Sequence, residues 1–365
     1  MFLKTIKLLS ISVSVAAISV NGAFAGSMDD LVAAAKKEGM LTTIALPHSW
    51  CGYGEVIEGF KKKYGIEVNE LNPNAGSGDE LEAIKANKGN TGPQAPDVID
   101  VGLSFGPAAK KDGLLQSYKV STWDEIPDSA KDADGYWYGD YYGVLAIGVN
   151  KDIFPESPAS FADLKDPKFA QGVTLGGDPL TGNSRMMTVY AAGASTGAKP
   201  GADALNAGIA YFKELKENGN LVPVEGTAQN LAQGTAPVLF DWDYNLLAMR
   251  DKLNGNPPMD VIVPSDAVIA GVYVQAISAY APHPNAAKLW MEYLYSDEGQ
   301  LLWLKGYCHP IRFNALAEAG KLPEGLMEKL PPAENYSKAV FPTLEEQAAA
   351  KEAIAANWTK EMSAQ

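Results

Sequence analysis

Short apolar runs alternate with segments of helical periodicity along most of this chain, and this alternation limits the possible folds more than any other feature. A helix is predicted over 28–39 and a strand over 40–46. Further strands are predicted at 66–71 and 96–101, each followed by a helical stretch. Strands that alternate with helices at this spacing are typical of a parallel α/β sheet.

The alternation begins again after Asn150, with strands expected at 173–175, 236–241, 261–264 and 272–279 and helices at 184–194, 203–217 and 286–304. A second α/β segment of this length predicts a second lobe, since a chain of 365 residues is too long for one comfortable core. No low-complexity linker separates the two segments. We therefore expect the chain to cross between the lobes on strands, near 143–150 and 260–272.

The first 25 residues have the layout of a secretory signal peptide. Lys4 and Lys7 precede an apolar run over 8–20, and Ala23-Phe24-Ala25 places small residues where a signal peptidase reads. The run is shorter than the roughly 20 residues that a membrane-spanning helix needs. Cleavage after Ala25 and export to the periplasm are the expectation.

The formal net charge is −14, from 44 acidic and 30 basic side chains. Binding to nucleic acid or to an anionic membrane requires an excess of Lys and Arg, so both are excluded as expected partners. The overall charge says little about a small ligand, because a local site can carry either sign.

Only two cysteines are present, Cys51 and Cys308. An even number in an exported chain favours a disulfide, and two buried free thiols are the alternative. The three histidines are scattered at 48, 283 and 309, without the spacing of a metal site. Neither a metal nor a cofactor is therefore expected.

Several segments together resemble a periplasmic solute-binding protein of an ABC importer, in the two-lobed class that includes iron-, polyamine-, thiamine- and phosphonate-binding members. The segments extend over most of residues 28–315 and are Leu31–Gly39, Ala95–Val98, Asp112–Leu115, Tyr142–Asp152 and His283–Trp290. Each motif is loose alone, but their order and spacing are hard to reproduce by chance.

The resemblance implies an α/β periplasmic-binding-protein fold, with two lobes joined by two hinge strands and a ligand cleft between them. The expected divisions are a signal peptide at 1–25, a first part of lobe 1 at 26–143, lobe 2 at 144–262, and at 263–365 a return to lobe 1 with C-terminal helices. The resemblance also implies a monomer without catalytic activity. This monomer would deliver a small polar solute to a membrane permease that works with ATP-binding subunits. A sensor that reports ligand to a membrane receptor would have the same fold. The family places Cys51 and Cys308 on one lobe, which agrees with a disulfide.

Two clusters are candidate ligand contacts, and they suggest opposite ligand charges. Asp241-Trp242-Asp243-Tyr244 at a strand end offers an aromatic face and carboxylates to an organic cation. Thr181, Asn183, Ser184 and Arg185 lead into a helix whose N-terminus could hold an anion. Solvated acids with a buried Trp, and an ordinary N-cap, are the alternatives. The residues expected to line one cleft are Ser49, Trp50, Ser104, Phe105, Thr181, Asn183, Ser184, Arg185, Asp241, Trp242, Asp243, Tyr273 and Gln275.

The family also disfavours two ligands. Iron-binding members present adjacent tyrosines in the second lobe, whereas the pair here, Tyr141-Tyr142, precedes the first hinge strand. Polyamine binders tend to have an aromatic residue followed two positions later by Asp, but Tyr273 is followed by Gln275. Ferric iron and polyamines are both disfavoured.

One motif supports a different class of function. Residues 102–106 form a literal G-x-S-x-G after a predicted strand, where α/β-hydrolases place a nucleophile. Asp241 with His283 or His309 would follow Ser104 in the required order. His283 lies between two prolines at a helix start, a poor position for a general base. An exported serine hydrolase is therefore the alternative function.

Overall fold

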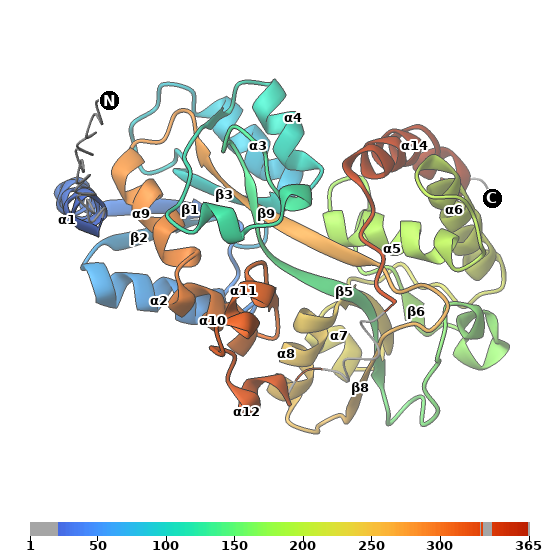
Figure 1. The fold of residues 1–365 in the computed structure, drawn as a ribbon. Coiled ribbons are helices and arrows are strands. Elements are labelled where there is room, and N and C mark those ends of the chain that lie inside the picture. Colours follow the sequence, from blue (N-terminus) through green and yellow to red (C-terminus); the bar gives the residue numbers. More distant parts are fainter. Residues whose placement is uncertain (1–20, 329, 331–337, 364–365) are drawn as a thin grey trace, which may run out of the picture.

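The computed structural model describes residues 21–328, 330 and 338–363, arranged as two α/β lobes side by side (Figure 1). The predicted signal peptide lies mostly outside the described residues, so its cleavage stays a prediction. Helix α1 begins at Asn21 and ends at Glu38, close to the end predicted for the first helix. No helix among the described residues is long and apolar enough to cross a membrane.

The first lobe is built largely from the N-terminal cycle of strands and helices. Strands β1 and β2 pair in parallel. Two hydrogen bonds join β1 to Asp97, the residue before the third strand. The Asp97 N–H donates to the Thr42 carbonyl oxygen (2.8 Å), and the Thr42 N–H donates to Asp97 Oδ2 (2.7 Å). The elements are β1 (Met40–Ile44), α2 (Tyr53–Tyr64), β2 (Glu67–Leu71), α3 (Ser77–Ala86), β3 (Val98–Gly102), α4 (Phe105–Lys111) and β4 (Leu115–Gln116).

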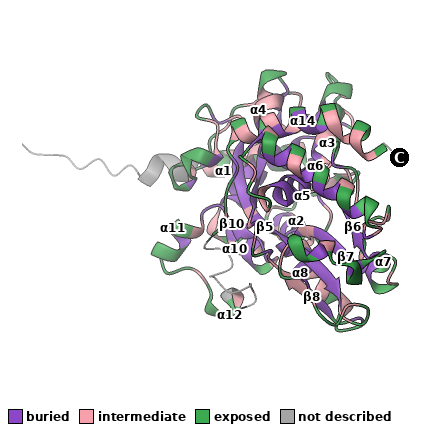
Figure 2. Cartoon of the chain, turned by 90° about the vertical axis from the view of Figure 1, so that its right-hand side faces the viewer, coloured by how far each residue is buried: buried purple, intermediate pink, exposed green. Residues whose placement is uncertain are grey.

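Two long strands join the lobes, β5 (Tyr138–Asn150) and β9 (Ala270–Ser278). Residues 138–144 of β5 pair with β9, and residues 145–149 pair with β7 (Val238–Trp242) of the second lobe. β8 (Met259–Ile262) also pairs with β5, and the chain then continues from β8 into β9. Almost all of β5 is buried, as its colour in Figure 2 shows, so each hinge strand is part of the core.

The expectation of a parallel sheet is only partly correct. The parallel pairs are β1 with β2, and β6 (Val173–Thr174) with β7. The pairs β3–β9, β9–β5 and β5–β7 are antiparallel. The reason is topological: a strand that carries the chain from one lobe to the other runs against the strands that it lies beside.

Two closely packed helices dominate the second lobe, α5 (Asn183–Ala194) and α6 (Ala202–Glu217). Gly193 and Gly208 make this approach possible, because a Cβ at either would collide with the Ala204 or the Val189 carbonyl oxygen of the facing helix. Helices α7 (Ala228–Ala232) and α8 (Asp243–Leu253) complete this part of the lobe.

The helix predicted over 286–304 is two helices, α9 (Pro284–Leu294) and α10 (Asp297–Lys305). Ser296 separates them, because its Oγ accepts a hydrogen bond from the Gly299 N–H (3.1 Å) and caps α10. The chain then forms β10 (His309–Pro310), α11 (Phe313–Glu318) and α12 (Glu324–Met327).

The last helix, α14 (Leu344–Ser363), lies on the second lobe against α6 (Figure 1). The chain therefore passes between the lobes a third time. Val340 lies in this connecting segment and is held beside β9, since the Ala270 N–H at the start of β9 donates to the Val340 carbonyl oxygen (2.9 Å). The interruption expected at Pro331-Pro332 lies outside the described residues.

Candidate ligand-binding site

Aromatic rings from both lobes meet beside the hinge strands. Trp50 follows β1 in the first lobe, and its ring centroid lies 5.5 Å from that of Tyr244 on α8 of the second lobe. Trp50 also lies 5.3 Å from Tyr273 on β9, which stacks on Tyr141 of β5 at 5.6 Å. We call Trp50, Tyr141, Trp242, Tyr244 and Tyr273 the aromatic cluster.

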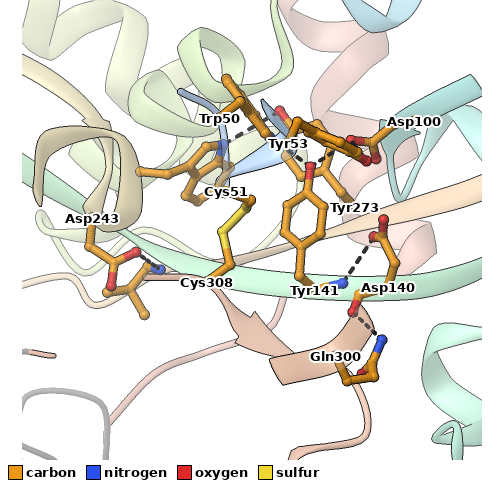
Figure 3. The surroundings of a disulfide bond; sticks show 12 residues. Trp50, Cys51, Tyr53, Asp100, Asp140, Tyr141, Asp243, Tyr273, Gln300 and Cys308 are labelled. Atoms are coloured by element: carbon orange, nitrogen blue, oxygen red, sulfur yellow. Dashed lines mark hydrogen bonds between the residues drawn. A yellow bond between two sulfur atoms is a disulfide. The ribbon is translucent and has the colours of Figure 1, made fainter. Parts of the chain in front are cut away.

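Hydrogen bonds fix the orientation of the cluster from the first-lobe side (Figure 3). Trp50 Nε1 donates to the Tyr141 hydroxyl (2.6 Å), which in turn donates to Asp100 Oδ2 (2.6 Å). The Tyr53 hydroxyl donates to the same carboxylate oxygen (2.7 Å). Trp50 is therefore connected to a buried acid through one tyrosine.

Asp100 belongs to a group of three buried carboxyl groups with Glu80 and Asp140. Burial raises the pKa of Asp100 to about 7, although hydrogen bonds from Tyr141 and Tyr53 partly oppose the shift. Burial also raises the pKa of Asp140 and of Glu80 well above the usual range, and Asp100 adds to both shifts. Among the described residues, no Lys, Arg or His forms an ion pair with any of the three.

The two clusters that suggested opposite ligand charges are joined in the structure. Arg185 Nη1 lies 3.3 Å from Asp241 Oδ1 and donates to Ser184 Oγ (2.9 Å). Arg185 Nε donates to the Gly176 carbonyl oxygen (3.1 Å). The guanidinium expected to hold an anion is thus largely neutralised by an acid expected to hold a cation.

The lobes are in contact around the cluster. A Cβ at Gly102, at the end of β3, would lie 2.6 Å from Nδ2 of Asn183 on α5. A Cβ at Gly76 would lie 2.9 Å from the Thr181 carbonyl oxygen. The Tyr307 hydroxyl donates to Asp251 of α8. These contacts define a closed arrangement of the two lobes.

Several buried polar atoms near the interface have no hydrogen-bond partner among the described residues. They include Ser104 Oγ, Asn183 Oδ1, Tyr244 Oη, Asp100 Oδ1 and Gln275 Oε1. Buried polar atoms nearly always have partners, so such a group marks a place where a ligand or water can bind. The amide oxygens of Asn183 and Gln275 accept hydrogen bonds and cannot donate them, and the same holds for Asp100 Oδ1 when Asp100 is ionised.

The structure brings several of the residues predicted for the site to the lobe interface, but at different depths. Trp50 contacts Tyr244 of the second lobe and Tyr273 of β9, and Asn183 faces Gly102 of the first lobe. Arg185 and Asp241 are paired within the second lobe, and Ser104 lies at the start of α4 with its Oγ buried. Phe105 and Thr181 lie at the rim of the interface. Trp242 and Asp243 are fully buried; Trp242 packs on Gly271, and Asp243 Oδ1 accepts from the Val144 N–H (3.0 Å). Ser49 is exposed and carries none of these contacts.

Gln275 is also fully buried. Its Nε2 donates to the Tyr53 hydroxyl (2.6 Å) and to Asp140 Oδ2 (3.1 Å), so it orders the acids behind the cluster. Sequence reasoning missed Tyr53 and Asp100 as site residues, and it named Tyr244 only as the last residue of the cluster that begins at Asp241. The acid within the otherwise apolar strand Val98–Gly102 was the signal for Asp100.

The cysteines are joined in the structure, with Cα atoms 5.4 Å apart. Because Cys51 follows Trp50 directly, the disulfide holds the loop that carries this ring against the segment after α10 (Figure 3).

The described contacts do not assemble a hydrolase triad. His283 Nδ1 lies 2.9 Å from Asp97 Oδ2, and His309 stacks on Tyr142. Ser104 Oγ has no hydrogen-bond partner among the described residues. A nucleophilic serine needs a base within hydrogen-bond reach, so the G-x-S-x-G motif finds no support here.

Two α/β lobes that meet over polar and aromatic groups beside hinge strands define a two-lobed binding protein. The family described as bacterial extracellular solute-binding protein matches residues 94–335, and the chain belongs to this family. It is therefore the substrate-binding component of an ABC import system. Such components work with a membrane permease and an ATPase. A comparison with curated protein sequences gave no match.

Solved structures share the fold at low sequence identity. The periplasmic binding protein P5PA is 22% identical, with a TM-score of 0.69, and the match covers 89% of this chain and 99% of that one. AfuA from Actinobacillus pleuropneumoniae is 21% identical (TM-score 0.67; 88% and 97% covered). AgtB from A. tumefaciens is 18% identical (TM-score 0.69; 89% and 99% covered).

Proposed function

We propose that this protein captures a small organic solute that carries an amino group, binds it between the two lobes without chemical change, and delivers it to its permease in the periplasm. The observation that carries the proposal is the set of unpartnered buried acceptors beside the aromatic cluster, Asp100 Oδ1, Asn183 Oδ1 and Gln275 Oε1. An ammonium group supplies up to three hydrogen-bond donors and a positive charge to such acceptors.

The charges at the interface support the same ligand class. Arg185, the basic residue of the predicted anion loop, is paired with Asp241. Burial raises the pKa of Asp100 to about 7, and Asp100 forms no ion pair with Lys, Arg or His among the described residues, so an ammonium group beside it would favour its ionised form. The ring faces of Trp50 and Tyr244 add the attraction that aromatic groups exert on a cation.

Related folds show that the scaffold alone does not determine the ligand. AfuA was solved with fructose-6-phosphate, and AgtB was solved with agropinic acid. The side chains at the interface must therefore decide which solute is bound here.

Capture requires the lobes to separate and close. We assign this motion to bending of β5 near the division expected at residue 143, and of the segment between β8 and β9 that follows the division expected at residue 262. Loops at the ends of strands in both lobes then surround the solute, which is a common mode of closure in two-lobed binding proteins.

A thermal-shift screen tests the ligand class at pH 7 and low salt. The panel contains aliphatic amines, amino acids, sugar phosphates and dicarboxylates. A bound solute at a hundredfold excess over its dissociation constant stabilises the fold by about 2.7 kcal/mol. We expect stabilisation by amino compounds in the wild type and its loss in Tyr244→Ala. Tyr280→Ala, away from the interface, is the control.

Stabilisation confined to compounds without an amino group would contradict the ligand class. Turnover of a simple ester that disappears in Ser104→Ala would contradict the assignment as a carrier.

A further inference from the structure

A pocket of about 70 Å³ lies at the rim of the interface, outside the aromatic cluster. Three parts of the chain form its walls: α4 of the first lobe, the segment that leads into α5, and the C-terminal helix α14. Its lining includes Phe105, Leu180, Asn183, Met186, Lys351 and Ile354. The pocket therefore exists because the chain crosses to the second lobe a third time.

Lys351 brings a positive charge into this pocket. Its Nζ lies 3.6 Å from the centre of the Phe105 ring, across the boundary between the lobes. No carboxylate among the described residues forms an ion pair with Lys351, whereas neighbouring Lys85 is paired with Glu82 and Asp112. Partial burial, with repulsion from Lys85, lowers the pKa of Lys351. A half-buried ammonium that lacks a counterion is a place where an anionic group gains a strong contact.

The inner wall of the pocket leads to the acceptors already described. Asn183 is 6% exposed, and its Oδ1 has no hydrogen-bond partner among the described residues. The same side chain faces Gly102 at the lobe interface. A solute whose amino group reaches Asn183 and the aromatic cluster can thus extend its other end toward Lys351.

We propose that Lys351 is a ligand-binding residue, and that the rim pocket is a subsite for an anionic oxygen group, a carboxylate or a phosphate, on the captured solute. This inference rests on the proposed function, and it narrows the solute to a compound with an amino group at one end and an anionic group at the other. The anion replaces the Phe105 ring as the main partner of the ammonium. Because Lys351 belongs to α14 of the second lobe and Phe105 to the first, a group bound between them favours the closed arrangement.

Paired probes test the subsite by calorimetric titration at low salt. One series contains ω-amino carboxylates of three to six carbons, a second contains the alkylamines of the same lengths, and a third contains the alkyl carboxylates that lack the amino group. Phosphoethanolamine and ethanolamine form a further pair that distinguishes a phosphate from a carboxylate. The variants are Lys351→Met and, as a matched control on the exposed part of the same helix, Lys360→Met.

We expect the wild type and Lys360→Met to bind the best anionic probe at least tenfold more tightly than its amine partner. Lys351→Met should lose this preference and keep the affinity for the amine within about twofold, since the charge contact is worth a factor of ten or more. Urea unfolding of Lys351→Met checks that the variant is folded.

Each outcome separates the subsite from the proposed function. Equal affinity of the wild type for both members of every pair, or a preference that persists in Lys351→Met, overturns the subsite alone. If carboxylates that lack an amino group bind to the wild type and do not bind to Lys351→Met, the subsite is supported. The proposal that the solute carries an amino group is then contradicted. Absence of binding in all series overturns both.

Discussion

At the scale of single residues, Asp100 lies in an environment unlike that of an ordinary, exposed aspartate. It is buried in β3, accepts hydrogen bonds from two tyrosines, and lies near two further buried acids. Through Tyr141 it also orients Trp50. The free-energy cost of burying an ionised Asp100 is therefore linked, through Tyr141, to the position of the Trp50 ring at the interface.

The shift of Asp100 predicts how stability depends on pH. Its pKa in the folded chain, about 7, lies above the usual value, so the folded state holds a proton that the unfolded state releases. This contribution to stability is complete at low pH and is lost as the pH rises through about 7. Asp100→Asn should therefore gain stability relative to wild type between pH 5 and pH 8, by roughly 2–4 kcal/mol.

Urea unfolding at the two pH values measures this difference. The exposed Asp124→Asn serves as the control, because its free energy of unfolding should follow that of the wild type. An equal pH dependence in Asp100→Asn and wild type would show that Asp100 is ionised throughout.

At the scale of elements, the disulfide ties the loop after β1 to the segment after α10. The two segments approach so closely that a Cβ at Gly306 would collide with the Cys51 backbone. Gly52 is nearby as well, since a Cβ there would lie 3.3 Å from Gly306 Cα. Both segments belong to the first lobe, so the bond leaves the hinge strands unconstrained.

Removing both cysteines tests this tie. Cys51→Ser with Cys308→Ser should lower the free energy of unfolding by about 2–5 kcal/mol, chiefly because the unfolded chain gains freedom. The fluorescence of Trp50 should also change, because its loop loses an anchor. Reductant should destabilise the wild type and leave the double variant unaffected. Two free thiols per chain in denatured, unreduced wild type would contradict the pairing.

At the scale of the whole molecule, contacts between the lobes decide whether the closed arrangement can form. Gly102 is the closest of these contacts at the interface, because Asn183 occupies the space that a side chain would need. Gly78, on α3 of the same lobe, has open space around its Cα. The two positions form a matched pair for testing closure.

Gly102→Ala should weaken binding of the best amino compound by about 10–100-fold, since overpacking costs about 1–3 kcal/mol. The unliganded protein should keep most of its stability, because an open arrangement removes the clash. Small-angle scattering should show ligand-dependent compaction in wild type and Gly78→Ala, and a smaller change in Gly102→Ala. Wild-type affinity in Gly102→Ala would show that Asn183 can move aside freely.

The sequence by itself determined the two-lobed α/β plan, the boundaries of most strands and helices, and the second half of the first hinge strand, residues 144–149. The first half of β5, from Tyr138 to Gly143, was not predicted as strand. The predicted features follow from local patterns: apolar runs form strands, and periodic segments end at glycine or proline. Trp50 could be predicted as an interface residue because it follows a strand, and Asn183 because it leads into a helix. Tyr273 was expected there from the resemblance to the family.

Only the tertiary structure decided the direction of strand pairing, the break at Ser296, and the pairing of Arg185 with Asp241. The same holds for the three buried acids and for the place of Lys351 over Phe105. Each depends on segments far apart in the chain, which hydrophobic periodicity does not relate to one another. Burial and charge pairing arise only when those segments pack, so the ligand-facing chemistry could not be read from local sequence.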